Sequence, residues 1–376
     1  MLDYKIKVPF FDASAQYIAN KAELDEVMQE VLKKGAYING PEVNIFANDL
    51  ADYLNINQVI PCANGTDALC LALMALDLNK GDEIIVPTFN FIAAAEAVAF
   101  LGLTPVFADV NEDNFNIDAE SIVKRITPKT KAIIVVHLFG AAADMDTIMS
   151  LADEYQIPVI EDVAQSLGGE YKGRKLGTIG TIACTSFFPT KNLACFGDGG
   201  AVFTNDVELA EKIKMLANHG QKKKYEHQYI GVNSRLDTLQ AAILTHQLKQ
   251  LDDNIEKRSK LAKRYSDGLN NLDIELPKET AHIKHSFNQY CILLQNESQR
   301  DRLKKYLADQ GISTMIYYAK PNHLQEAFSF LGFKECDFLI SEDICKKVLA
   351  LPISSALSFE HQNYVIDHIN RFFANA

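Results

Sequence analysis

Apolar and polar positions between residues 58 and 204 follow a pattern that predicts strands alternating with helices. Short apolar runs predict strands at residues 58–63, 82–87, 105–109, 131–137, 158–162, 181–187 and 201–204. Segments with helical spacing lie between them, at residues 66–76, 92–101, 118–126 and 146–155. Several strands are almost wholly apolar, which is typical of a mainly parallel sheet buried on both faces. The pattern therefore predicts an α/β fold.

The flanking segments predict different elements. Helical spacing at residues 21–34 ends at Gly35, a suitable C-cap, and a second helix follows Pro41. Towards the C-terminus we expect one long helix at residues 235–269, a strand–helix–strand unit at 287–294, 298–309 and 312–318, and helices at about 340–349 and 361–373. We therefore predict a large domain over residues 1–245, with an N-terminal arm, and a small α+β domain over residues 246–376. A helix rather than a flexible linker would join them.

Composition and charge narrow the class of protein. The 376 residues are 48% hydrophobic and 23% charged, as in ordinary globular proteins, and the formal net charge of -12 argues against non-specific nucleic-acid binding. The most apolar stretch, residues 86–108, is interrupted by Asn90, Glu96 and Pro105. It predicts a buried strand–helix–strand rather than a membrane span. We expect no membrane partner.

Cysteine and histidine usage predicts neither disulfides nor a metal site. The seven cysteines form no CxxC pair, which favours free thiols in a reducing compartment, and residues 1–7 lack the apolar run of a signal peptide. We therefore expect a cytoplasmic protein. His282 and His285 lie close together, but no further ligand accompanies them, so we expect surface histidines and no metal.

The candidate chemistry lies where predicted strands end. In parallel sheets ligands gather beyond the carboxyl ends of the strands, and His137, Asp162 and the turn Asn64-Gly65-Thr66 all fall there. Lys191 follows the strand at residues 181–187 and precedes a Gly-rich turn. An acid at a strand end with a later lysine is the arrangement that holds pyridoxal phosphate. The lysine forms a Schiff base with the aldehyde, and the acid pairs with the pyridine nitrogen.

Each of these residues also has an ordinary structural interpretation. A single lysine is usually a solvated surface charge, and Asp162 could simply cap the following helix. A desolvated Lys191 would instead favour its neutral, nucleophilic form. Gln165 lies three residues after Asp162 and could reach a ring substituent. These positions become informative only as a set.

A phosphate group would need its own contacts. The free amides at the start of the helix after Gly65 and Thr66 favour an anion, and the hydroxyl of Ser186 could donate to it. Either could equally be an ordinary turn. Phe89 could stack on a flat ring, or it could be a core aromatic. No Gly-x-Gly-x-x-Gly follows a strand and no Walker phosphate loop occurs, which disfavours a dehydrogenase.

Several motifs together resemble one family, the pyridoxal-phosphate-dependent sugar aminotransferases of the DegT/DnrJ/EryC1/StrS group. The motifs are Gly65-Thr66-Asp67-Ala68-Leu69, Gly81-Asp82-Glu83, Glu161-Asp162-x-Ala164-Gln165-Ser166, Ser186-Phe187-x-x-x-Lys191, Gly197-Asp198-Gly199-Gly200, Asn218-His219-Gly220 and Asn233-Ser234-Arg235-Leu236-Asp237. The resemblance extends from about residue 7 to the C-terminus. It implies the aspartate aminotransferase-like fold type I, in a homodimer whose active sites are shared between subunits.

The resemblance also implies roles for individual residues. Lys191 and Asp162 would be catalytic. The implied cofactor contacts are Lys191, Asp162, Gln165 and Phe89 at the ring, with Gly65, Thr66, Ser186 and the partner subunit's Asn233 at the phosphate. The implied substrate contacts are Arg235 from across the interface, Tyr318 and the adjacent Tyr317.

Within the family, residues 187–200 look most like those of enzymes that aminate UDP-linked 3-oxo-hexuronic acids. L-Glutamate as amino donor and a role in surface polysaccharide synthesis, such as that of O-antigen, are expected from the family. Tyr317-Tyr318-Ala319 stands where the family often has His-Tyr-Pro, and this departure concerns sugar specificity. The alternatives are a sugar 4-aminotransferase and a non-catalytic regulatory protein that keeps the fold. Lys191 in place of histidine argues against the family's dehydratases.

Overall fold

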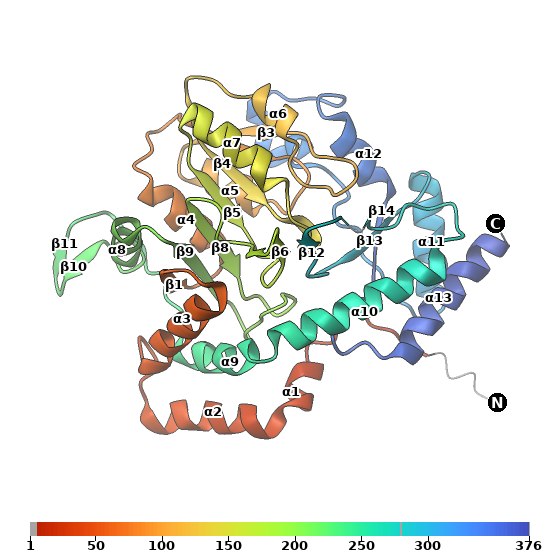
Figure 1. The fold of residues 1–376 in the computed structure, drawn as a ribbon, viewed down its shortest axis with the longest axis horizontal. Coiled ribbons are helices and arrows are strands. Elements are labelled where there is room, and N and C mark those ends of the chain that lie inside the picture. The colour runs from red at the N-terminus through yellow and green to blue at the C-terminus, as the bar shows by residue number, and fades with distance from the viewer. Residues whose placement is uncertain (1–5, 279, 376) are drawn as a thin grey trace.

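The structure, a computed structural model, describes residues 6–278 and 280–375 (Figure 1). Residues 1–5, most of the segment that was tested for a signal peptide, lie outside these ranges. The N-terminal elements are α1 (Ala15–Ala19), α2 (Lys21–Lys34), α3 (Pro41–Leu54), β1 (Gln58–Cys62), α4 (Gly65–Ala75), β2 (Glu83–Pro87), α5 (Ala93–Phe100), β3 (Thr104–Ala108), α6 (Ala119–Val123), β4 (Thr130–Val136), α7 (Met145–Tyr155), β5 (Val159–Asp162), β6 (Glu170–Tyr171), β7 (Arg174–Lys175), β8 (Ile182–Ser186) and β9 (Gly200–Thr204). The remaining elements are α8 (Val207–Leu216), β10 (Gln221–Lys223), β11 (Glu226–His227), α9 (Thr238–Leu248), α10 (Leu251–Leu269), β12 (Ile283–Lys284), β13 (Tyr290–Leu293), α11 (Glu297–Asp309), α12 (Leu339–Lys347), β14 (Val348–Leu351) and α13 (Phe359–Ala374).

A seven-stranded sheet in the order β1-β9-β8-β5-β4-β2-β3 forms the centre of the molecule. Strands β3, β2, β4, β5 and β8 pair in parallel, and β9 runs antiparallel to both of its neighbours, β8 and β1. Every strand of this sheet except β9 therefore points the same way, and the prediction of a mainly parallel sheet is confirmed. The strands predicted from residue 58 to residue 204 all form, within about one or two residues of the expected bounds.

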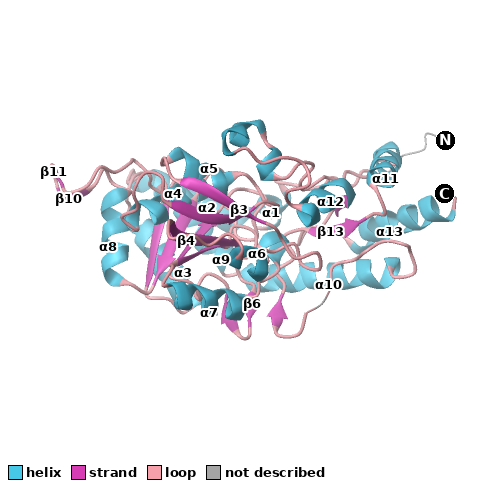
Figure 2. Ribbon diagram, turned by 90° about the horizontal axis from the view of Figure 1, so that it is seen from above, coloured by secondary structure: helices cyan, strands magenta, loops and turns pink. Residues whose placement is uncertain are grey.

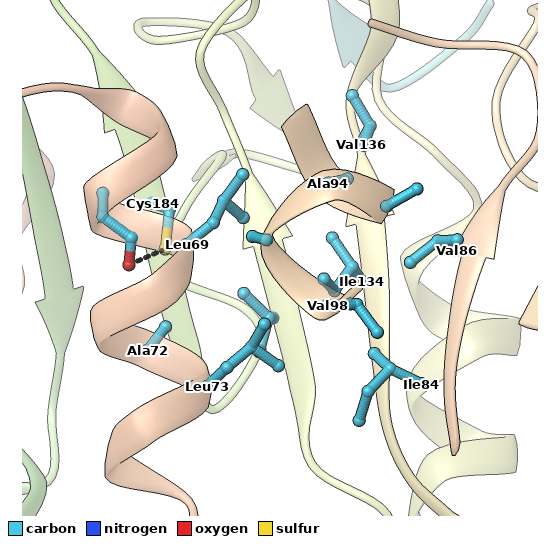
Figure 3. Packing of buried hydrophobic residues seen from close by; sticks show 14 of the residues in the cluster. Leu69, Ala72, Leu73, Ile84, Val86, Ala94, Val98, Ile134, Val136 and Cys184 are labelled. Atoms are coloured by element: carbon cyan, nitrogen blue, oxygen red, sulfur yellow. Dashed lines mark hydrogen bonds between the residues drawn. The ribbon is translucent and has the colours of Figure 1, made fainter. Parts of the chain in front are cut away.

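Helices cover both faces of this sheet (Figure 2). Buried residues of α4, α5 and α8 pack on one face, and those of α3, α7 and α9 pack on the other. Figure 3 shows Ile134 of β4 beside Val98 of α5, and Leu69 and Leu73 of α4 belong to the same cluster. Truncating such a buried aliphatic side chain to alanine typically costs about 2–5 kcal/mol. This packing fixes the positions of the strand ends.

One contact in this layer joins α4 to β8. The thiol of Cys184 donates a hydrogen bond to the carbonyl oxygen of Ala68 at 3.2 Å (Figure 3). Ala68 lies in the first turn of α4, and Ser186 lies two residues beyond Cys184 at the end of β8. The contact therefore helps to set the start of the helix against the end of the strand. All seven cysteines are free thiols.

The C-terminal part corrects three of the predicted elements. The helix predicted at residues 235–269 is two helices, α9 and α10, which meet at Lys249 and Gln250. Residues 312–318 form no strand, because only Ile312 and Met315 make isolated bridges. The strand that pairs with β13 is β14, part of which was predicted as the end of a helix. A short apolar segment can serve as either element, and pairing with β13 decides this one.

Helix α10 links two hydrophobic cores (Figure 1). Its first turns, with Leu251 and Ile255, belong to the core beneath the sheet. Its later turns, with Leu261 and Tyr265, belong to a separate core shared with α11, α13, β13 and β14. The division of the chain at residue 245 stays a prediction. Within the described residues, no helix is long and apolar enough to span a membrane.

Candidate active site

A cavity of about 680 Å³ opens at the carboxyl ends of β1, β5 and β8. Its lining includes most of the residues predicted to bind the cofactor or the substrate, namely Gly65, Thr66, Asp162, Gln165, Ser186, Lys191, Tyr317 and Tyr318. Side chains separated by up to 253 positions in the sequence thus meet in one place. The sheet explains this convergence, since parallel strands bring their carboxyl ends to the same edge.

Lys191 lies on a turn just beyond β8, and its amide donates to the carbonyl oxygen of Phe188 at 2.9 Å. Among the described residues, the side-chain amine of Lys191 has no hydrogen-bond acceptor and no ion-pair partner. Burial lowers the pKa of the Lys191 amine, and the negative charge of Asp162 opposes this shift. A lowered pKa favours the neutral form of Lys191, and the neutral form of an amine is the nucleophilic one.

Asp162 ends β5 with its carboxyl group facing the same cavity. One carboxylate oxygen accepts a hydrogen bond from the amide of Ala164 at 2.9 Å. Residues 163–169 form turns and no helix, so this bond closes a turn and the helix-capping interpretation is wrong. Burial raises the pKa of Asp162, and the Ala164 amide and the charge of Lys191 act in the opposite direction. A cationic nitrogen placed beside this carboxylate would favour its ionised form.

The neighbouring acid, Glu161, points into the protein. Its carboxylate accepts hydrogen bonds from the amides of Gly177, Ile179 and Gly180 at 2.6–2.9 Å and from the imidazole of His137 at 3.0 Å. Burial alone would raise the pKa of Glu161, but these hydrogen bonds outweigh it and the net pKa is lowered. The other imidazole nitrogen of His137 accepts from Ala143, so His137 is saturated and faces away from the chemistry.

The orientation of the Gln165 amide is fixed by two hydrogen bonds. Its oxygen accepts from the amide of Phe139 at 2.9 Å, and its nitrogen donates to the hydroxyl of Tyr318 at 3.0 Å. The oxygen therefore faces the protein. One N–H of the side chain remains for a ligand, so Gln165 can only donate to a group in the cavity.

The other end of the cavity has the features of an anion site. The side chain of Asn64 caps α4 by accepting from the amide of Asp67, and the preceding amides of the first turn are left without helical partners. A Cβ at Gly65 would lie 2.7 Å from the Cβ of Ser186, so only glycine permits this approach. The hydroxyl oxygen of Ser186 accepts from the amide of Phe188, which leaves its proton for a ligand.

Aromatic rings line the wall between these two ends. Phe91, Phe188, Tyr317 and Tyr318 border the cavity, whereas Phe89 does not. Phe89 is 1% exposed and packs edge-on against Phe139 and Tyr318, so its location is that of a core aromatic. Phe91, two residues later and 58% exposed, is the aromatic that reaches the cavity from this segment. The sequence could have indicated Phe91 as a cavity residue, because it lies on the turn after β2.

Asn233 and Arg235 are not brought to the cavity of their own chain. Asn233 is exposed and forms an isolated bridge with Asn218. Between them, Ser234 is fully buried, and its hydroxyl accepts from the amide of Ala63 at 3.1 Å. Their proposed contribution to the partner's site stays a prediction.

A second cavity of about 430 Å³ lies between α10 and residues 277–291. Its lysines already have carboxylate partners, in the pairs Lys260–Glu256, Lys263–Asp267, Lys278–Asp113 and Lys284–Glu170. His285 lines it and is not a surface histidine, contrary to expectation. Its ring stacks on Phe287 with 3.9 Å between centroids, and burial lowers the pKa of His285 to about 3. The described residues contain no cluster suited to a metal ion.

The sequence of the chain matches known proteins over almost its full length. The profile of the DegT/DnrJ/EryC1/StrS aminotransferase family matches residues 19–370. A pleiotropic regulatory protein of Geobacillus stearothermophilus is 43% identical over 98% of this chain and 99% of its own length. UDP-2-acetamido-2-deoxy-3-oxo-D-glucuronate aminotransferase of Pseudomonas aeruginosa is 42% identical over 92% of this chain and 95% of its own. The dTDP-3-amino-3,4,6-trideoxy-alpha-D-glucose transaminase of Streptomyces venezuelae is 40% identical over 97% and 96%, respectively.

Solved structures give the same result for the fold. The Streptomyces venezuelae protein DesV superposes with a TM-score of 0.95 at 40% identity, over 97% of this chain and 98% of that chain. NtdA from Bacillus subtilis, solved with bound cofactor PMP, superposes with a TM-score of 0.91 at 33% identity, over 100% and 87%. The aminotransferase fold predicted from the sequence is thereby confirmed.

Proposed function

Since the chain belongs to the DegT/DnrJ/EryC1/StrS family of pyridoxal-phosphate-dependent sugar aminotransferases, we propose that it aminates a UDP- or dTDP-linked 3-oxo sugar with L-glutamate as amino donor. The product would be a nucleotide-linked amino sugar for a surface polysaccharide. The observation that carries the proposal is the unpaired amine of Lys191, which lies in one cavity with Asp162 and the start of α4.

The residues of the cavity fit the cofactor at both ends. The free amides after Gly65 and the hydroxyl proton of Ser186 suit a phosphate. At the opposite end Asp162 suits a protonated ring nitrogen, and the free N–H of Gln165 suits an oxygen on the ring. Phe91 supplies an exposed aromatic face next to them. In our proposal Phe91 takes the stacking role that the family resemblance had given to Phe89.

The chemistry divides between the cofactor and the protein. Bound pyridoxal phosphate supplies the electron sink that makes the α-proton of the amino donor acidic. Lys191 would hold the cofactor through its aldehyde, and its amine is the group placed to accept or return that proton. The lowered pKa of Lys191 favours the basic, unprotonated form of the amine. Asp162 keeps the ring nitrogen charged throughout.

The choice of a 3-oxo sugar rests on the names of relatives. Four proteins named as acting on a 3-oxo or 3-amino sugar are 40–42% identical to this chain. A fifth, from Micromonospora megalomicea, is 34% identical, and GDP-perosamine synthase of Escherichia coli is 35% identical. A sugar 4-aminotransferase is the runner-up. A regulatory protein is a further alternative, because the relative with that name is 43% identical. The accessible Lys191 favours turnover over a purely regulatory role.

We also propose a homodimer with shared active sites. Arg235 and Asn233 lie outside the cavity of their own chain, so they would need a second copy to reach a ligand. Large apolar side chains are also exposed, at Leu32, Tyr37, Ile38, Ile45, Phe188 and Val232. Of these, Ile38 bridges to Asp237 and Tyr37 accepts from the amide of Thr238, close in sequence to Arg235. An interface between two copies would cover such a surface.

The test of this function replaces Lys191 with alanine. We expect Lys191→Ala to lose the visible absorbance of lysine-bound cofactor and at least about 1,000-fold in turnover, because among the described residues no other lysine lines the cavity. Wild type and variant are incubated with L-glutamate and a panel of UDP- and dTDP-linked 3-oxo and 4-oxo sugars, with products identified by mass and proton couplings. Full transamination by the variant would contradict the assignment, and preference for 4-oxo sugars would select the runner-up.

A further inference from the structure

The segment Ser286–Gln289 lies between β12 and β13. Two of its residues, Asn288 and Gln289, line the cavity. The amide of Ser286 donates to the carbonyl oxygen of Gly140 at 3.0 Å, and the amide of Gln289 donates to that of Phe139 at 3.2 Å. A Cβ at Gly140 would lie 2.7 Å from the amide nitrogen of Phe287, and Gly140 has a φ of 109°. Two segments of backbone are thus in direct contact where only glycine fits.

The side chain of Asn288 extends from this segment to the turn that carries Lys191. Its amide nitrogen donates to the carbonyl oxygen of Thr190 and to the side-chain oxygen of Asn192, each at 3.2 Å. The amide nitrogen of Asn192 donates in return to the carbonyl oxygen of Ser286 at 3.2 Å. Asn288 is 3% exposed and Asn192 is 7% exposed. The residues on both sides of Lys191 are therefore bonded to the same segment.

A buried arginine holds the segment from its other side. The guanidinium of Arg258, on α10, donates to the carbonyl oxygens of Phe287, Asn288 and Ile353 at 3.1–3.4 Å. Arg258 is 4% exposed and, among the described residues, has no carboxylate in ion-pair distance, and burial lowers its pKa to about 10. All three bonds come from one nitrogen of the guanidinium, Nη1, and a buried cation bonded to backbone carbonyls in this way fixes the path of that backbone.

We propose that Asn288 is a positioning residue, which holds the turn of Lys191 so that the amine meets the aldehyde of the cofactor. The proposal rests on the proposed function, in which Lys191 carries the cofactor. Among the described residues 188–192, which form the lysine turn, the internal backbone hydrogen bond is that from Lys191 to Phe188. The paired amides of Asn288 and Asn192 add three more bonds to this turn. Because reacting groups must lie about 3 Å apart and aligned, a shift of 1 Å in this turn can slow a reaction about 100-fold.

The experiment separates positioning of the lysine from binding of the cofactor. Apoenzyme of the full chain is mixed with pyridoxal phosphate, and covalent capture is followed by absorbance. The dissociation constant of pyridoxamine phosphate is measured in parallel, since this form binds the cavity but cannot bond to lysine. We expect Asn288→Ala to slow capture at least about 10-fold. Asn288 also lines the cavity, but the side-chain nitrogen that it would lose donates to Thr190 and Asn192. The affinity for pyridoxamine phosphate should therefore change less than about twofold.

Two further variants complete the design. Asn192→Ala removes the other half of the amide pair and should show the same split, so it replaces Asn288→Ala if that variant does not fold. Asn370→Ala is the matched control, because its amide also donates to two carbonyl oxygens, those of Gly268 and Ile366, but on α13 far from the cavity. Its capture rate should equal that of wild type.

The outcomes distinguish this proposal from the function on which it rests. Capture by Asn288→Ala at the wild-type rate would overturn the positioning role, as would equal losses in capture and in pyridoxamine phosphate affinity. Either result leaves Lys191 as the cofactor lysine. If Lys191→Ala instead captured pyridoxal phosphate covalently at the wild-type rate, the proposed function itself would be contradicted.

Discussion

At the scale of single residues, Asp162 and Lys191 influence each other's charge. Burial favours the neutral form of both, which means a raised pKa for the acid and a lowered pKa for the amine. Each opposes the shift of the other through its charge. The cofactor ring would lie between these two groups, and its protonated nitrogen would give the carboxylate of Asp162 a cationic partner.

Asp162→Asn tests this coupling. Because the Asp162 carboxylate raises the pKa of Lys191, its removal should lower the pH midpoint at which the Lys191 amine of the apoenzyme becomes reactive. That midpoint is measured by reductive methylation over a pH series, read by peptide mass spectrometry. Turnover should fall about 100-fold or more, since the ring nitrogen loses its counter-charge. An unchanged midpoint together with unchanged turnover would remove Asp162 from its role.

Single residues were predictable from the sequence where their position along a strand decides where they point. Asp162 and Ser186 end strands, so their place at the cavity follows from the strand pattern. Phe89 and Phe91 show the limit of this reasoning. Both follow β2, and only the folded path of the turn decides that Phe89 enters the core and Phe91 the cavity. Asn288 has no local signal, because its partners are about 100 positions away.

At the scale of elements, the anion site depends on how closely α4 approaches the end of β8. Both Gly65 and Gly200 are needed for this approach, since a Cβ at Gly200 would lie 2.4 Å from the carbonyl oxygen of Asn64. The register of the sheet explains the crowding, because Gly200 pairs with Cys62 on one side and with Ser186 on the other.

Gly65→Ala should weaken binding of the cofactor through its phosphate. The new Cβ would lie 2.7 Å from the Cβ of Ser186 and must push the helix start away from the hydroxyl. We expect pyridoxal phosphate affinity to fall at least about 10-fold, measured by fluorescence titration of the apoenzyme, while pyridoxal, which lacks the phosphate, loses less. Gly197→Ala is the control, since its Cβ meets only Gln240 at an ordinary 3.4 Å. Equal losses for both ligands would argue against a phosphate site here.

The order of strands and helices was predictable between residues 58 and 204, where apolar runs are separated by clear turns. The break between α9 and α10 was not, because Lys249 and Gln250 are compatible with a continuous helix. The two helices separate because α9 packs on α2 and α3, whereas α10 packs on α13. Tertiary contacts of this kind are not visible in local periodicity.

At the scale of the whole molecule, one chain alone leaves the proposed site incomplete. The hairpin of β10 and β11 projects from the end of the molecule away from α11 and α13 (Figures 1 and 2). Its tip bears Tyr225, which is 81% exposed, and Ile230 just beyond it is 94% exposed. In the proposed homodimer, these groups and Arg235 would contact the partner subunit rather than the cavity of their own chain.

Mixed dimers test this arrangement. Lys191→Ala and Arg235→Ala chains are co-expressed with different tags and assayed for transamination. If each site takes Lys191 from one chain and Arg235 from the other, half of the dimers are mixed and each has one intact site. Activity should then return to about a quarter of wild type, although each variant alone is inactive. No recovery in dimers shown to be mixed would place Arg235 at the site of its own chain.

The two consecutive acids Glu161 and Asp162 have a consequence for how this fold tolerates change. Alternation along β5 directs Glu161 to four donors in the interior and leaves Asp162 with one. The strand end is thus anchored by a group that never meets the ligand. A change at Asp162 therefore removes one hydrogen bond and leaves the four at Glu161 in place, so that the residue facing the ring can vary while most of the anchor of the strand is kept.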